Sequence, residues 1–311
     1  MLRIIIIIYK IQKKLEKPIY LLEKLLIYLG IKLNITFYDI FLINHLGSNH
    51  SKRLHLLSEF YNKNKGSKTA PYAPQQNIYK NIFIVGDSHA EYHGRNFERI
   101  NKKFQVNFKS IWTGPNLLID FCNNKFVSNS VIKKLKRLNA NKELNLILCY
   151  GEIDLRVAFY RLLNFNKKFN SENDLIEFYV KNLVNKISDF KKELNLLFNF
   201  KVNIFFKEIT PPTNIDGELP NNLEELKKIM KNNEFPTLGD KFDRANWSKK
   251  LNFAIKNSSI KKSFLSIPTS GYNSDGMINK EYSDNHHFTD DRFLELCQES
   301  FLNEINNVTS L

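Results

Sequence analysis

The amino-acid sequence predicts an α/β fold with a five-stranded, mainly parallel sheet and helices on both of its faces. From residue 81 onward, short apolar runs alternate with helical patterns, as in chains that form parallel sheets. The run at residues 82–85 is rich in Ile, Phe and Val and lacks polar alternation, which indicates a strand that is covered on both faces. The chain of 311 residues suits a core of about 200–230 residues that carries an appendage.

Each predicted strand is followed by a predicted helix. The strands are expected at residues 82–85, 105–109, 144–150, 202–207 and 263–267. The helices are expected at about 89–100, 128–140, 172–197, 221–232, 244–257 and 290–305. In sheets of this kind ligands bind at the carboxyl ends of the strands, so the residues just after each strand are the first candidates for a functional site.

The N-terminal part of the chain differs in character from the rest. Residues 1–62 predict a basic, mainly helical extension, residues 63–80 predict a linker rich in turn formers, and residues 81–311 form the predicted core domain. Within the extension, the apolar stretch Pro18–Leu29 predicts a short helix that packs on the core domain or on a partner chain. The alternative is that residues 1–32 contact a membrane interface, because lysines flank this helix.

The basic charge lies mostly in the N-terminal part. The formal net charge is +14. Residues 1–80 hold 13 Lys and Arg against 4 Asp and Glu, a balance of +9, which leaves 33 against 28, or +5, for residues 81–311. A basic surface attracts nucleic acid, anionic lipid or anionic glycan. We expect no nucleic-acid partner, because no recognition motif accompanies the charge and lysine is abundant throughout the chain.

The sequence indicates a soluble cytoplasmic protein without a metal or a cofactor. The three cysteines, Cys122, Cys149 and Cys297, are too widely spaced to indicate a zinc site or a disulfide framework. Three histidines between residues 45 and 55 have a five-residue spacing, which does not align ligands on one helical face. No convincing secretory signal is present, nor any run of about 20 apolar residues that could span a bilayer.

The most informative stretch is Asn81–Ala90, in which an apolar run ends at Gly86-Asp87-Ser88 and a helical pattern begins. Gly86 permits a tight exit from the strand, and both Asp87 and Ser88 are good helix N-cap residues. This geometry places the Ser88 hydroxyl at the carboxyl edge of the sheet, where the free N–H groups of a helix N-terminus suit a developing negative charge. The motif therefore indicates a nucleophile, with a plain capped turn as the alternative.

A second motif, Asp284-x-x-His287, comes just before the last predicted helix. An acid and an imidazole on one loop can act as orienting group and general base for a serine. An ordinary helix N-terminus is the alternative explanation of this spacing, and His286 is a less well-fitting candidate for the base. The order of the motifs favours the catalytic interpretation, because the Gly-Asp-Ser comes first and the Asp-x-x-His precedes the final helix.

With these two motifs the sequence resembles the SGNH/GDSL hydrolase family, in a Gly-Asp-Ser-His variant, over about residues 81–306. The resemblance implies a three-layer, flavodoxin-like fold with Ser88 as nucleophile, His287 as base and Asp284 as acid, and it implies no cofactor. It also implies an oxyanion hole made by the backbone N–H groups of Ser88 and Gly114. Gly114 follows the second predicted strand, where a simple turn is the alternative.

The block Gly151–Arg156 matches the glycine and the aspartate of the family's Gly-x-Asn-Asp pattern but has Ile153 in place of the asparagine. In the family this asparagine donates a hydrogen bond to the oxyanion, and an isoleucine cannot. Losing one such donor can cost about 2.7–4 kcal/mol of transition-state stabilisation. Asn116 and Arg156 are the nearby candidates to replace it. The resemblance further implies that Glu152, Asp154, Arg156 and Asn116 bind substrate. The alternative for Glu152 and Arg156 is that they pair with each other.

We therefore expect a serine esterase that cleaves O-acyl esters, above all O-acetyl esters, on a carbohydrate. The substrate class comes from the resemblance, because a Gly-Glu-Ile-Asp block followed by Arg is similar to a variant associated with surface polysaccharides. The same covalent mechanism supports O-acyl transfer if a sugar hydroxyl replaces water. Ile153 favours a further alternative, a binding module for a glycan or a protein that has lost catalysis. A nucleotide-binding site is not expected, because no Gly-x-Gly-x-x-Gly follows the first strand.

Two segments after the fourth predicted strand are expected to shape the site. The segment Lys207–Pro212 should form a rigid rim at the carboxyl edge of the sheet. The residues from there to about Asp243 are rich in Asn and Lys, and they are expected to act as a lid over Ser88.

Overall fold

The computed structural model describes residues 80–309, except residues 101–105, 138–142, 167, 200, 234 and 285. All of these described residues belong to one unit, Asn77–Leu311. The predicted extension, the membrane contact through residues 1–32 and nearly all of the predicted linker lie outside the described residues and stay predictions.

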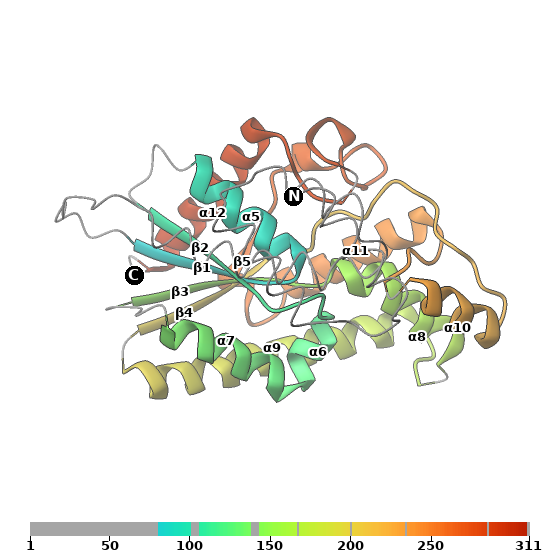
Figure 1. Ribbon diagram of the computed structural model, residues 1–311, viewed down its shortest axis with the longest axis horizontal. Helices are drawn as coiled ribbons and strands as arrows, with labels where there is room; N and C mark the ends of the chain where they lie inside the picture. The colour runs from blue at the N-terminus through green and yellow to red at the C-terminus, as the bar shows by residue number, and fades with distance from the viewer. Residues whose placement is uncertain are drawn as a thin grey trace, which may run out of the picture. The chain divides into compact units, whose positions relative to one another are not determined.

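The described chain forms one five-stranded sheet in which every pair of neighbouring strands is parallel (Figure 1). The order across the sheet is β2-β1-β3-β4-β5, which is the flavodoxin-like order. The strands are β1 (Lys80–Gly86), β2 (Val106–Trp112), β3 (Glu143–Cys149), β4 (Lys201–Lys207) and β5 (Phe264–Leu265). The predicted α/β fold with a five-stranded parallel sheet is thus confirmed.

Helices cover both faces of this sheet (Figure 1). Successive strand residues point to opposite faces. Ile82 and Ile84 of β1 therefore pack under one helical layer, whereas Phe83 and Val85 pack against the other. The first layer consists of α5 (Ser88–Ile100) and α12 (Asp291–Thr309). The second layer contains α6 (Leu118–Asn123), α7 (Lys125–Arg137), α9 (Glu172–Phe198) and α11 (Lys241–Lys256).

The last strand is shorter than the predicted range 263–267. After Leu265, the backbone N–H groups of Ser266 and Ile267 donate to side-chain carboxylates and not to a neighbouring strand. Ser266 N lies 3.2 Å from Glu304 Oε2, and Ile267 N lies 2.7 Å from Glu208 Oε2. The ladder stops because β4, the only neighbour of β5 in the described sheet, itself ends at Lys207.

Three short helical elements between β2 and α9 were not predicted from the sequence. They are α6, the π-helical turn η2 (Asp154–Ala158) and α8 (Phe159–Phe165), which continues from η2. Helix α6 has only six residues, and the carboxylate of Asp154, 36 positions later than Leu118, accepts hydrogen bonds from its first turn. Such an element depends on a distant partner, so local periodicity gives little sign of it.

The segment that was expected to act as a lid contains α10 (Leu223–Asn232) and is tied firmly to the domain. The side chain of Arg244 in α11 is fully buried, and its guanidinium donates to the carbonyl oxygens of Ile215 and Leu238. Leu238 N in turn donates to the carbonyl oxygen of Arg156 at 2.8 Å. The segment is therefore held by α11 near both of its ends, and by the turn η2 at Leu238.

No helix in the described part of the chain combines the length and the apolar composition that crossing a membrane requires.

Candidate active site

Ser88 lies where β1 passes into α5, at the carboxyl edge of the sheet. A Cβ atom at Gly86 would lie 1.9 Å from the carbonyl oxygen of Cys149 on β3, so this position accepts only glycine. The next N–H group, that of Asp87, donates to the same oxygen at 3.3 Å. These contacts bind the turn to the centre of the sheet and leave Ser88 exposed as the first residue of α5.

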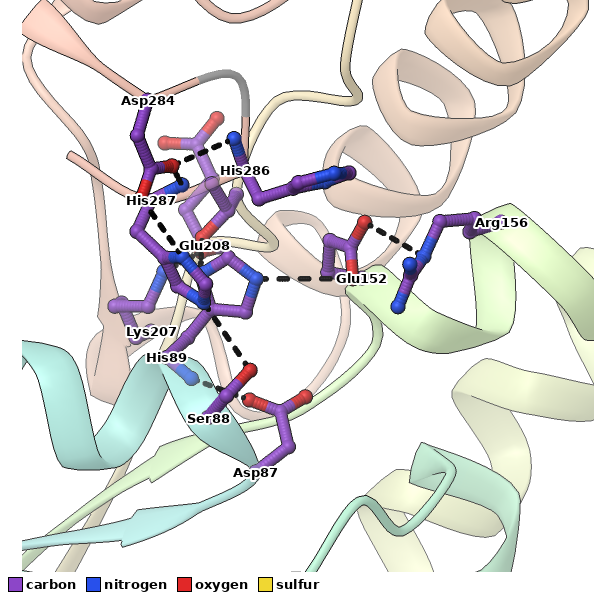
Figure 2. Close-up of polar contacts among 11 residues, drawn as sticks. Asp87, Ser88, His89, Glu152, Arg156, Lys207, Glu208, Asp284, His286 and His287 are labelled. Carbon is purple, nitrogen blue, oxygen red and sulfur yellow. Dashed lines mark hydrogen bonds and ion pairs between the residues drawn. The ribbon is translucent and has the colours of Figure 1, made fainter. Parts of the chain in front are cut away.

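The structure brings Ser88 together with His287 and Asp284 (Figure 2). Ser88 Oγ lies 3.2 Å from His287 Nε2, although 199 positions separate the two residues in the sequence. On the other side of the imidazole, His287 Nδ1 lies 3.5 Å from Asp284 Oδ2. A hydroxyl, an imidazole and a carboxylate in this order can activate the hydroxyl as a nucleophile.

A tight turn fixes the carboxylate of Asp284. Its Oδ1 accepts hydrogen bonds from the backbone N–H groups of His286, at 3.0 Å, and His287, at 2.7 Å. The interaction with the His287 side chain, followed by these backbone bonds, holds the pKa of Asp284 well below its usual range. Asp284 is therefore ionised at neutral pH, as an acid that stabilises an imidazolium must be.

Two rings from α5 hold the imidazole of His287 in place. Tyr92 stacks on it, with ring centroids 4.6 Å apart and an angle of 10° between the planes. His89 packs against it at the same centroid distance, with a tilt of 43°. Figure 2 shows the His286 ring directed away from Ser88, toward the side where Glu152 and Arg156 lie. Of the two neighbouring histidines, the structure places His287 beside Ser88.

The loop after β2 supplies a second backbone donor near Ser88. Thr113 donates to the carbonyl oxygen of Gly86 twice, from its backbone N at 2.8 Å and from its Oγ1 at 2.9 Å. These bonds hold the following residue, Gly114, close to the start of α5. Gly114 has a φ of 103°, which only glycine adopts without strain. No described residue accepts a hydrogen bond from the N–H of Ser88 or Gly114, so both donors are available to an oxyanion.

Ile153 belongs to the core and not to the reacting centre. Its side chain is buried in an apolar cluster that joins η2 to α10 and the segment after it, with Val157, Leu226 and Leu238. Asn116, one candidate for the missing donor, uses Nδ2 to bond the carbonyl oxygen of Thr113 at 2.6 Å. Its side-chain amide therefore shapes the Gly114 loop.

Glu152, which is buried, and Arg156, which is half-buried, form an ion pair beside the site (Figure 2). Glu152 Oε1 lies 3.3 Å from Arg156 Nε, but the N–H is not directed along this line, so the contact is electrostatic. Glu152 Oε2 lies 3.7 Å from His89 Nε2. Burial alone would raise the pKa of Glu152, yet Arg156 and His89 together lower it below its usual value. Burial also lowers the pKa of His89, to about 4, so this histidine is neutral at pH 7.

Asp154, another expected substrate ligand, makes contacts within the protein. Its carboxylate is fully buried and accepts hydrogen bonds from Leu118 N at 2.5 Å and from the hydroxyl of Tyr179 at 2.9 Å. Burial raises the pKa of Asp154 to about 6. The residue positions α6 and, through it, the loop that carries Gly114.

Sequence reasoning missed two groups that organise the site. Glu208 accepts hydrogen bonds from Ile267 N at 2.7 Å and from the hydroxyl of Tyr272 at 2.5 Å, so it clamps the loop that leads to Asp284. Tyr92 stacks on His287 and lies four positions after Ser88, on the same face of α5. That spacing would have indicated Tyr92, whereas no local signal indicates Glu208.

Asp87 is a buried carboxyl group next to the nucleophile. Its Oδ1 accepts a hydrogen bond from His89 N at 2.9 Å, while no described residue bonds its Oδ2. Burial raises the pKa of Asp87 to about 8. Because this value lies above that of an unfolded chain, about 3.9, the contribution of Asp87 to stability is present below pH ~4 and is lost as the pH rises to ~8.

We expect Asp87→Asn to remove this pH dependence, since asparagine keeps the Oδ1 acceptor and cannot ionise. The free energy of unfolding of the variant, relative to the parent, should rise between pH ~4 and ~8 and stay level above that. Urea unfolding at intervals from pH 4 to 9 measures it. A difference that does not change with pH would contradict the burial argument.

Within the described residues, no group of three or more His, Cys, Asp or Glu side chains is arranged to hold a metal ion.

No protein-family model and no curated protein matches the chain. Several solved structures are similar to it, and three of them follow. The first is a GDSL-like lipase from Bacteroides thetaiotaomicron, with 12% identity, a TM-score of 0.44, and coverage of 81% of this chain and 97% of that one. The second is a protein from Streptococcus pneumonia described in terms of platelet activating factor, with 13% identity, a TM-score of 0.40, and coverage of 80% and 97%.

The third similar structure is a protein from Slackia heliotrinireducens described as an SGNH hydrolase, with 11% identity, a TM-score of 0.41, and coverage of 72% and 99%. The first and third descriptions name the family that the sequence motifs resemble. Identities and TM-scores are low in all three comparisons.

Proposed function

We propose that the protein is a serine esterase that cleaves O-acyl esters, with O-acetyl groups on a carbohydrate as the favoured substrates. The observation that carries this proposal is the approach of Ser88 Oγ to His287 Nε2 at 3.2 Å, with Asp284 behind the imidazole. These groups come from opposite ends of the domain, and their meeting at the carboxyl edge of the sheet is what the motifs predict.

The geometry supports a two-step reaction. Ser88 Oγ attacks the carbonyl carbon of the ester while its proton passes to His287 Nε2, and Asp284 stabilises the imidazolium through Nδ1–H. The N–H groups of Ser88 and Gly114 receive the developing oxyanion. The imidazolium then gives its proton to the departing alcohol, which leaves an acyl group on Ser88. A water molecule, deprotonated by His287, attacks this acyl-enzyme and releases the carboxylic acid and free Ser88.

The same second step is possible with either water or an alcohol as the acceptor of the acyl group. If a sugar hydroxyl takes the place of water, the acyl group is transferred and a new ester forms, with the same residues in the same roles. The exposed position of Ser88 suits either acceptor. O-acyl transfer in polysaccharide modification is therefore the neighbouring proposal.

Ile153 supports a contrasting proposal, a glycan- or protein-binding module without catalysis. With isoleucine at this position the site relies on two backbone donors, and the loss of a third donor can cost about 2.7–4 kcal/mol. The intact arrangement of Ser88, His287 and Asp284, together with the lowered pKa of Asp284, supports the esterase over this alternative.

Covalent labelling with a serine-directed fluorophosphonate tests the proposal. We expect the parent protein to form an adduct at Ser88, and Ser88→Ala to form none. Ser259→Ala, which changes another exposed serine, serves as the matched control and should label like the parent. If folded parent protein is not labelled, or if Ser88→Ala still is, the esterase proposal fails.

A further inference from the structure

A groove separates α11 from the turn that contains residues 272–276. It encloses about 580 Å³, which is within the range of small-molecule binding sites, roughly 300–1,000 Å³. Its lining combines aromatic rings, lysines and small polar groups, including Phe242, Lys249, Phe253, Lys256, Tyr272 and Ser274. None of these residues belongs to the proposed catalytic group.

One face of α11 supplies the floor of this groove. Five exposed residues recur at helical spacing along it, and all five line the groove: Phe242, Asn246, Lys249, Phe253 and Lys256. The opposite face of the same helix is buried and contains Trp247, Leu251 and Ile255. The exposed residues therefore form one continuous stripe.

The two phenylalanines of this stripe are unusually exposed. Phe242 is 55% accessible and Phe253 is 69% accessible, whereas most phenylalanines in the described part of the chain are buried in the core. Eleven residues separate the two rings, which corresponds to about 16 Å along the helix. Exposed rings at this separation indicate a binding surface for an extended ligand.

The polar groups around the rings suit a ligand with many hydroxyl groups and a negative charge. Asn273 uses its Oδ1 to accept hydrogen bonds from Asp275 N and Met277 N, at 3.0 and 2.9 Å, which fixes the turn. Its amide donors bond no described residue. Of the two acidic residues in the lining, Glu208 is engaged by Ile267 and Tyr272, which leaves only Asp275 as an exposed carboxylate against two exposed lysines.

We propose that this groove binds an extended anionic glycan, with sugar rings stacked on Phe242 and Phe253 and acidic groups near Lys249 and Lys256. A sugar ring presents an apolar face of C–H groups and a rim of hydroxyls, which matches rings that alternate with amides and lysines. A partner helix would need an unbroken apolar stripe, but Asn246 and Lys249 interrupt this one. The assignment concerns binding and does not depend on the proposed esterase activity.

The groove and the catalytic group share one loop. Tyr272 in the groove wall donates to Glu208, and the chain continues from this tyrosine to Asp284 and His287. A polymer held in the groove would therefore lie along the loop that supplies the base. The groove suits a long substrate that is bound at one place and cleaved at another.

Calorimetry with the full-length Ser88→Ala protein tests the proposal, because this variant binds without turning over. The probes are carboxylated octasaccharides from hyaluronan and from alginate, with neutral maltooctaose as the comparison. We expect saturable binding of at least one carboxylated probe. We expect Phe242→Ala/Phe253→Ala to weaken it at least tenfold and Lys249→Gln/Lys256→Gln at least fivefold, with a smaller dependence on salt.

Matched variants on α9 serve as controls. Leu196→Ala removes another exposed apolar side chain, and Lys191→Gln/Lys192→Gln removes two other exposed lysines. Neither should change the affinity more than twofold. The proposal is overturned if neither carboxylated probe binds, if maltooctaose binds equally well, or if the α9 lysine variant weakens binding as much as the groove variant. The proposal is also overturned if Phe242→Ala/Phe253→Ala leaves glycan affinity unchanged but alters the sedimentation coefficient. The stripe would then be a contact between copies of the chain.

Discussion

Replacing His287 by alanine is expected to lower kcat/KM for ester hydrolysis by about 10⁵–10⁶-fold, as loss of the base does in serine proteases. His287 Nε2 is the only imidazole nitrogen among the described residues that bonds Ser88 Oγ. His286, by contrast, should tolerate alanine with less than a tenfold change, because its ring points away from Ser88 (Figure 2). Steady-state kinetics on an acetyl ester measures both variants.

His286→Ala is the matched control for this experiment. It changes the same residue type on the same turn, and its backbone N–H still bonds Asp284. Added imidazole should restore part of the activity of His287→Ala, since the cavity left by the ring lies beside Ser88. Equal losses of activity in the two variants would contradict the role of His287 as the base, because they would show that any change to this turn disturbs the site.

The second large effect is expected at the ion pair of Glu152 and Arg156. Arg156→Met should lower the free energy of unfolding by about 3–5 kcal/mol, because it leaves the carboxylate of Glu152 buried without its main partner. Only 7% of the Glu152 side chain is accessible, so water cannot take over the role of the guanidinium. Urea unfolding at pH 7 measures the effect.

Two comparisons separate charge from packing. The double variant Glu152→Gln/Arg156→Met should recover most of the lost stability, because no charge is then left unpaired. Lys227→Met breaks a shorter but exposed pair, with 2.8 Å between Lys227 Nζ and Glu224 Oε1, and should cost only ~0–1 kcal/mol. If the double variant is as unstable as Arg156→Met, the loss comes from packing.

The pH dependence provides a further check on this pair. The folded state lowers the pKa of Glu152, so its contribution to stability is present above the unfolded pKa, about 4.3. That contribution is lost as the pH falls toward the folded value. The difference in the free energy of unfolding between Arg156→Met and the parent should therefore become smaller below pH ~4.

The sequence predicted the elements that local pattern determines. The apolar runs that became β1, β3 and β4 have no polar alternation, because both of their faces are covered, and their bounds agree with the predicted ranges within two residues. The two motifs were also recognisable, since each occupies one short stretch. That Ser88 and His287 meet follows from their positions at the carboxyl edge of the sheet and before the last helix.

Contacts between distant residues could not be predicted in this way. The sequence predicted that Asp154 binds substrate, and it left open whether Glu152 binds substrate or pairs with Arg156. In the structure, Asp154, the first residue of the π-helical turn η2, contacts the first turn of α6. Glu152, which precedes η2, lies beside His89 and pairs with Arg156. Glu208 likewise has its partners, Ile267 and Tyr272, about 60 positions later in the chain.

The residue at position 153 can either donate a hydrogen bond to an oxyanion or contribute to apolar packing. An asparagine there could stabilise an oxyanion, but in the present surroundings its amide would be buried among Val157, Leu226 and Leu238. Full burial of an isoleucine is worth about 1.5–3 kcal/mol, and a buried amide without partners loses a comparable amount. Ile153 therefore contributes to the packing of α10 and supplies no side-chain donor. An asparagine at position 153 would therefore weaken the packing of α10, and a second substitution would be needed to restore that packing.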